Sequence, residues 1–387
     1  MAVEGKFAKP STVGESHTVN LKIAHIQRFP RDIIHANLDF DCCNERGSVR
    51  SPHCRRRHTE AFPGARWPKR QATIPRHKHL LRSTLFFCQK PMHPSRSEYL
   101  DLPNIRLHIR RWGNPAAPTL FLLHGWMDVS ASFQFVVDEL KRDWNIIAPD
   151  WRGFGPSQWL NRPYFFAEHL GDMEAIIDRY APAGKIRLAG HSMGGILACL
   201  YAGLRPERVE KLVTLEGFGI APTTPEMAPE RYRHWLDELK SPPRMHVYPE
   251  RATFARRLLK TDPFLTPERA DFLSRHLARI GDGTTKGGER RHGIIWNGDP
   301  WHKSTSPYLF RLEESIAIWK QVTCPVLWVA GRQSWIVRDY ATRPGDWEAR
   351  RACFAEVREE WIDNADHMLH HDQPAEVARL IENWFTT

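Results

Sequence analysis

The sequence predicts an α/β protein built on a doubly wound, mostly parallel sheet. Short apolar runs alternate with segments of helical periodicity through most of the 387-residue chain, and this alternation is typical of such sheets. Several runs are apolar on both faces, as strands buried between two layers of helices are. We therefore expect the functional residues at the carboxyl ends of these strands.

The expected elements follow in chain order. Strands are expected at residues 105–112, 118–123, 144–148, 185–189, 211–215, 325–330 and 357–362. Helices are expected at about 133–142, 166–180, 193–204, 308–321 and 374–385. This order predicts one α/β core formed by residues 92–217 and 308–387.

Residues 218–307 interrupt the alternation. They are rich in Pro, Arg and aromatic residues, and helical patterns are expected at 229–240, 252–260 and 267–280. The glycine-rich residues 281–288 lack the Gly-Lys-Ser/Thr ending of a phosphate loop, so a flexible loop is expected there. An insertion of this length inside an alternating fold predicts a helical lid.

The excess of positive charge lies entirely in residues 1–91. This basic leader holds 17 Lys and Arg against 7 Asp and Glu, so the chain's 55 basic and 45 acidic residues leave 38 of each kind in residues 92–387. The leader has no sustained helical or strand period. We expect an irregular, disordered extension, or sequence upstream of a true start at Met92. Because the remainder is balanced in charge, no nucleic-acid partner is expected.

The sequence predicts a cytoplasmic protein. Residues 1–30 contain no apolar segment typical of a secretory signal, and the acidic residues Glu4, Glu15 and Asp32 argue against a mitochondrial presequence. No run of roughly 18 apolar residues exists, so no integral membrane segment is expected. A zinc site in the leader is disfavoured because no Cys-x2-Cys pair occurs. Its candidate ligands would be Cys42, Cys43, His53, Cys54 and His58.

The strongest motif is Gly-His-Ser-Met-Gly at residues 190–194, directly after the expected strand 185–189 and before a helix. Gly-x-Ser-x-Gly in this strand–turn–helix setting forms a tight turn with a strained serine backbone. The turn presents the Ser192 hydroxyl at a helix N-terminus, where the helix dipole favours developing negative charge. Ser192 is therefore the candidate nucleophile.

With two further motifs, the sequence resembles the α/β-hydrolase fold family, in its serine-nucleophile branch with a helical lid. His-Gly-Trp-Met-Asp at residues 124–128 follows the strand 118–123, where the family builds half of its oxyanion hole. Residues 150–157 resemble the family's loop after the next strand. The resemblance covers about 105–387 and implies that the backbone N–H groups of Trp126 and Met193 form the oxyanion hole.

The resemblance also implies a histidine base late in the chain, because the family order is Ser, then acid, then His. His367 follows the expected strand 357–362 and occupies the family's position for this base. His370 and His371 are the competing candidates, close to the start of the final helix.

The acid departs from the usual pattern. Many family members carry an Asp at the position that Ser334 occupies here, and a hydroxyl cannot orient a histidine by charge. Glu216, directly after the strand 211–215, is favoured as the third triad member. Asp339 is the alternative if its loop folds back.

Together these residues predict a serine hydrolase that needs neither cofactor nor metal ion and cleaves an ester or similar small-molecule acyl substrate. One alternative is a carbon–carbon bond hydrolase that acts on a ring-cleavage product with the same type of triad. Another is a non-catalytic ligand-binding member of the fold, which Ser334 at the usual acid position keeps open. Oligomeric state and substrate chain length are not predicted.

Overall fold

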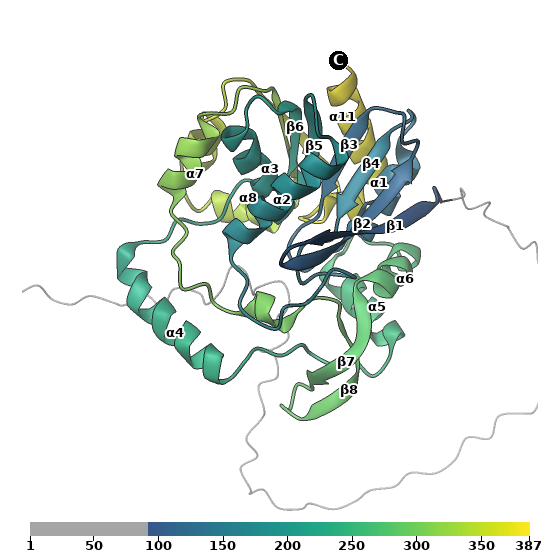
Figure 1. The fold of residues 1–387 in the computed structure, drawn as a ribbon. Coiled ribbons are helices and arrows are strands. Elements are labelled where there is room, and N and C mark those ends of the chain that lie inside the picture. The colour runs from purple at the N-terminus through teal and green to yellow at the C-terminus, as the bar shows by residue number, and fades with distance from the viewer. Residues whose placement is uncertain (1–91) are drawn as a thin grey trace, which may run out of the picture. The chain divides into compact units, whose positions relative to one another are not determined.

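The computed structural model describes residues 92–387 (Figure 1). The expectations for the basic leader, including its disorder and its candidate zinc ligands, lie outside the described residues. Within the described range, no helix combines the length and the apolar character needed to cross a membrane.

An eight-stranded sheet forms the centre of the described residues, with strand order β1-β2-β4-β3-β5-β6-β9-β10. The strands from β4 to β10 in this order pair in parallel, while β1 and β2 are antiparallel to their neighbours. The expected doubly wound, mostly parallel sheet is therefore confirmed. The strands are β1 (Ser95–Leu102), β2 (Ile105–Gly113), β3 (Thr119–Leu123), β4 (Asn145–Pro149), β5 (Ile186–His191), β6 (Val209–Leu215), β9 (Val326–Gly331) and β10 (Val357–Ile362).

Strand β1 was not expected from the sequence. It is an edge strand that pairs only with β2, from Ser95 opposite Trp112 to Leu102 opposite Ile105. Most of its side chains are exposed, so it lacks the apolar run that marks the buried strands. Polar edge strands of this kind also discourage pairing with other chains.

Helices cover both faces of the sheet (Figure 1). On one face, α1 and α11 pack together, and their apolar side chains join those of β3, β4, β5, β6 and β9 in one buried core. On the other face, α3 lies between α2 and α7. The helices of the core are α1 (Gln134–Glu139), α2 (Phe166–Tyr180), α3 (Met193–Leu204), α7 (Leu312–Trp319), α8 (Trp335–Tyr340), α9 (Asp346–Arg351), α10 (Leu369–Asp372) and α11 (Pro374–Thr386).

The segment between β6 and α7 contains three helices and a hairpin, which lie at one end of the sheet (Figure 1). Helices α4 (Ala228–Lys240), α5 (Arg251–Thr261) and α6 (Pro267–His276) form where helical patterns were expected, although α6 ends before 280. The expectation of a flexible loop at 281–288 was wrong for residues 281–284, which belong to a strand. Strands β7 (Ala278–Thr284) and β8 (Arg290–Trp296) form an antiparallel hairpin, and residues 285–289 connect them.

Two glycines explain why the sequence did not predict this hairpin. Gly281 and Gly283 interrupt the alternation of side chains that marks a strand. A side chain at Gly283 would lie 2.6 Å from the Met245 carbonyl, so glycine is needed for the close approach of that segment.

Candidate active site

Ser192 occupies the sharp turn between β5 and α3. Its backbone has φ 51° and ψ −117°, a conformation that non-glycine residues rarely adopt. Its N–H donates to the Leu215 carbonyl at 2.8 Å, which fixes the turn against β6. A side chain at Gly194 would overlap the carbonyl of Leu123, so the turn requires glycine at that position. The strained turn expected from the motif is present and leaves Ser192 partly exposed.

His367 lies next to Ser192. Its Nε2 is 3.1 Å from the Ser192 Oγ, and its Nδ1 is 3.5 Å from Oε2 of Glu216. The side chain is 14% exposed, so part of the ring remains accessible. His367 is held in the loop between β10 and α10. The three residues expected to act together are therefore close together, in the order serine, histidine, carboxylate.

Glu216 directly follows β6 and is completely buried. Its Oε1 accepts a hydrogen bond from the Gly331 N–H at 2.6 Å, and its Oε2 accepts one from the Ser334 hydroxyl at 2.7 Å. Asp339, the alternative acid, lies in α8 and forms an ion pair with Arg343 at 2.7 Å. The structure thus brings Glu216, and not Asp339, to His367.

Burial shifts the pKa values of both groups toward their neutral forms. Loss of hydration raises the pKa of Glu216 to about 8, against the lowering effect of the hydrogen bonds from Ser334 and Gly331. Burial also lowers the pKa of His367 to about 4, although the nearby Asp366 and Asp128 oppose this shift. At neutral pH the imidazole is uncharged, which is the state that a general base needs.

The loop after β3 passes close to the nucleophile. A side chain at Gly125 would lie 3.1 Å from the Ser192 Cβ, which shows how near the backbone of residues 124–128 comes. Trp126, expected in the oxyanion hole, follows Gly125 in this loop. Met193 is the first residue of α3, so its N–H has no acceptor within the helix.

The inserted segment is tied to the loops that carry these residues. The indole N–H of Trp296 donates to the Met127 carbonyl at 2.6 Å, and that of Trp126 donates to the His302 carbonyl at 3.2 Å. The Arg269 guanidinium in α6 donates to the carbonyls of His371 and Asp372, just after His367. Residues 218–307 therefore contact both sides of the site.

Backbone strain is concentrated around Ser192. Met127, Ser192 and Glu216 have φ values of 56°, 51° and 58°, all in the region that favours glycine. They lie beyond the carboxyl ends of the neighbouring strands β3, β5 and β6. Strain of this kind persists only where the surrounding structure enforces it, and it is typical of functional sites.

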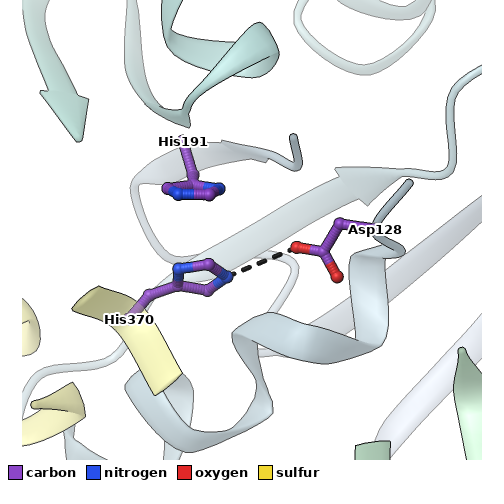
Figure 2. Close-up of side chains that lie close together, drawn as sticks. All are labelled: Asp128, His191 and His370. Carbon is purple, nitrogen blue, oxygen red and sulfur yellow. Dashed lines mark hydrogen bonds and ion pairs between the residues drawn. The ribbon is translucent and has the colours of Figure 1, made fainter. Parts of the chain in front are cut away.

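A second group of polar side chains, which sequence analysis did not single out as a site, lies close together and includes His191, the residue before the serine (Figure 2). Asp128, His191 and His370 are buried and offer ligand atoms within 4.8 Å of one another. His370, a competitor for the role of base, has its Nε2 3.4 Å from Asp128 Oδ2. Asp128 and His191 belong to the motifs at the carboxyl ends of β3 and β5, which are neighbours in the sheet, and this adjacency was the signal that sequence analysis could have used.

Comparison with known proteins identifies the class. The sequence profile described as the alpha/beta hydrolase fold matches residues 118–374, and the chain therefore belongs to this family. This confirms the resemblance drawn from the motifs. The structural neighbours include a thioesterase domain from the curacin biosynthetic pathway, with a TM-score of 0.63, 24% identity, and coverage of 75% of this chain and 99% of the domain. At this identity the likeness shows the fold alone.

Among curated proteins, the relatives are hydrolases by name. The chain is 26% identical over 315 residues to a serine hydrolase-like protein of Danio rerio, covering 77% of this chain and 91% of the relative. It is 28% identical over 242 residues to a 3-hydroxybutyrate-oligomer hydrolase of Cupriavidus necator, covering 59% and 77%. These findings support a hydrolase of the α/β fold, in the serine branch of the family.

Proposed function

We propose that this protein is a cofactor-independent serine hydrolase that cleaves an ester or similar small-molecule acyl substrate. The observation that carries the proposal is the short path from the Ser192 Oγ through the His367 imidazole to the Glu216 carboxyl, with steps of 3.1 Å and 3.5 Å. A serine hydroxyl is a weak nucleophile until a neighbouring base removes its proton, and this geometry supplies that base. The serine hydrolase-like relative adds support.

In the acylation step, the Ser192 Oγ attacks the substrate carbonyl carbon while its proton passes to His367 Nε2. The carbonyl π electrons move to the oxygen, which the N–H groups of Trp126 and Met193 stabilise. Glu216 stabilises the imidazolium that forms on His367. Loss of one oxyanion donor costs roughly 100–1,000-fold in turnover in related chemistry, so these N–H groups are central to the proposal.

Deacylation reverses the roles of the same groups. Acylation ends when collapse of the first tetrahedral intermediate breaks the bond to the leaving group, which takes the proton from His367. In deacylation a water molecule attacks the acyl carbon while His367 accepts one of its protons. Collapse of the second intermediate breaks the bond between the acyl carbon and Ser192 Oγ, His367 returns its proton to that oxygen, and the acid is released.

Residues 218–307 are proposed as the lid of this site. Support comes from the hydrogen bonds of Trp296 and Arg269 to backbone carbonyls beside the oxyanion loop and beyond His367. A cytoplasmic location is part of the proposal. The cysteines of the described residues, Cys199, Cys324 and Cys353, are all free and buried, as a reducing compartment allows.

The test combines a covalent probe with a substrate panel. A fluorophosphonate should label the full chain at Ser192 and should not label a Ser192→Ala variant. Labelling should be slower in the presence of any p-nitrophenyl ester that the protein hydrolyses. A folded protein inert to both reagents would instead be a ligand-binding member of the fold. Cleavage of a ring-cleavage dienone in preference to every ester would identify a carbon–carbon bond hydrolase.

A further inference from the structure

The buried residues Asp128, His191 and His370 are here called the Asp-His-His cluster. Each of them has a side-chain polar atom without a hydrogen-bond partner. Asp128 is 2% exposed, His191 is 1% exposed and His370 is fully buried. Asp128 Oδ1, His191 Nδ1 and His370 Nδ1 have no hydrogen-bond partner. Leaving such groups unpaired inside a protein costs free energy, so each calls for a physical explanation.

Other atoms of the cluster are held firmly in place. The Nε2–H of His191 donates to the His367 carbonyl at 2.8 Å, which leaves the Nδ1 lone pair free. The Ser132 hydroxyl donates to Asp128 Oδ2 at 2.8 Å. In metal sites, hydrogen bonds of this kind orient the ligands and fix the tautomer of each imidazole. Figure 2 shows the His191 ring over His370, with the Asp128 carboxylate facing His370 Nε2.

The dimensions of the cluster fit a single transition-metal ion. With metal–ligand bonds of about 2.0–2.2 Å, two ligand atoms on a tetrahedral ion lie roughly 3.4 Å apart. Asp128 Oδ2 and His370 Nε2, which share a hydrogen bond, are separated by 3.4 Å, and each of the three residues offers one atom within 4.8 Å of the others. A bound ion would replace the proton between these two atoms, and the unpaired Nδ1 of His191 would be its third ligand.

We infer that Asp128, His191 and His370 form a binding site for a divalent transition-metal ion of the Zn²⁺ type, and that the bound ion inhibits hydrolysis. Two imidazole nitrogens and one carboxylate oxygen are a ligand set typical of Zn²⁺ with one open position. The binding is independent of the proposed function, whereas the inhibition rests on it.

Inhibition follows from the position of the charge. The rings of His191 and His367 are 4.8 Å apart, centre to centre, so a cation on His191 lies close to the proposed base. A bound metal ion is often the largest local charge in a site. Its field opposes the positive charge that His367 gains when Ser192 attacks, so turnover falls as the site fills.

The binding experiment uses the full chain and Co²⁺, whose visible absorption reports its coordination. One Co²⁺ per chain should give a tetrahedral spectrum without the thiolate charge-transfer band that cysteine ligands add, and Zn²⁺ should displace it. Asp128→Asn and His370→Gln should each weaken binding by more than the roughly 10–100-fold that loss of a supporting hydrogen bond costs. The matched control is Asp282→Asn, because Asp282 and His292 form an exposed carboxylate–imidazole pair at 2.8 Å. It should leave binding unchanged.

The leader cysteines provide a second control. A full chain with Cys42, Cys43, Cys54 and Cys88 replaced by Ser should bind Co²⁺ as the unmodified chain does. Failure of the folded chain to bind one ion, or unchanged binding in both Asp128→Asn and His370→Gln, would overturn the metal site. Circular dichroism of each variant shows whether it is folded.

Inhibition is measured separately as ester hydrolysis during titration with Zn²⁺. The concentration for half-inhibition should match the Zn²⁺ dissociation constant, and a chelator should restore the rate. Metal binding without loss of rate would refute the inhibitory role and keep the site. A chain without ester hydrolysis but with metal binding would contradict the proposed function alone.

Discussion

The hydroxyl of Ser334 donates a hydrogen bond of 2.7 Å to Glu216 Oε2, the same oxygen that lies 3.5 Å from His367 Nδ1. Ser334 stands where many relatives of this fold would carry the acid itself. In the proposed triad the carboxylate comes instead from Glu216, directly after β6, and Ser334 in the loop after β9 donates a hydrogen bond to it. The serine at position 334 thus still contacts the carboxyl group beside His367, through a hydrogen bond to Glu216.

Replacement of the buried carboxylate should separate the two candidate acids. We expect Glu216→Gln to lower kcat by roughly 1,000–10,000-fold, because the imidazolium loses its counter-charge. Asp339→Asn should change kcat little, since that carboxylate pairs with Arg343 at the partly exposed end of α8. Ester hydrolysis by the two purified variants checks this ranking. A larger loss in Asp339→Asn would refute the assignment of Glu216.

The pKa of Glu216 predicts how activity depends on pH. Because burial raises that pKa to about 8, the carboxyl is protonated below this pH and ionised above it. Only the ionised form stabilises the imidazolium, so kcat/KM should rise as the pH increases through about 8 and then level off. His367, with a pKa lowered to about 4, does not titrate in this window. A pH–rate profile that is flat between roughly pH 6 and 9 would contradict the prediction.

Loss of the Ser334 hydroxyl should move this profile. That hydrogen bond favours the ionised carboxylate, so Ser334→Ala should raise the pKa of Glu216 and shift the rise in kcat/KM to higher pH. A hydrogen bond to a charged group contributes about 1.5–3 kcal/mol, which corresponds to a shift of about one to two pH units. Ser274→Ala, which removes another buried hydroxyl within α6, is the control and should leave the profile unchanged.

Two glycine substitutions should have opposite effects on stability. Gly194→Ala places a methyl group against the Leu123 carbonyl, and we expect it to lower the free energy of unfolding by about 1–3 kcal/mol or more. Gly171 is exposed within α2 and has no atom near the place of an added side chain. Gly171→Ala should raise the free energy of unfolding by about 0.5–1 kcal/mol, because alanine loses less backbone entropy in a helix. Urea denaturation of both variants measures the difference, and equal midpoints would contradict it.

Local patterns made much of the fold predictable. The buried strands and the helices on either side of the sheet follow from apolar runs and helical periodicity, and Ser192 follows from a turn whose residues are contiguous. Strand β1 could not be predicted this way, because an exposed edge strand needs no apolar run. The β7–β8 hairpin was missed because its glycines serve contacts with residues distant in sequence.

The site was predictable to the same extent. His367 could be placed from chain order, while Glu216 could only be favoured over Asp339, because the choice depends on how the loop after β9 folds. The contact from Ser334 to Glu216 joins residues 118 positions apart, and no local pattern encodes it. The Asp-His-His cluster likewise draws on three separate elements, which are the loop after β3, the last residue of β5 and helix α10.

The left-handed backbone at Met127 and Glu216 has a consequence for directed evolution. Each such residue costs on the order of 1–3 kcal/mol, a substantial part of the roughly 5–15 kcal/mol that keeps a typical domain folded. Glycine at 127 would relieve that strain but leave a cavity, because the Met127 side chain is buried and loss of a buried methionine side chain costs about 2–5 kcal/mol. Glycine at 216 would leave the Gly331 N–H and the Ser334 hydroxyl without their buried acceptor. A library screened for heat resistance alone should therefore keep a side chain at both positions, so the strained backbone should survive selection even where activity is not tested.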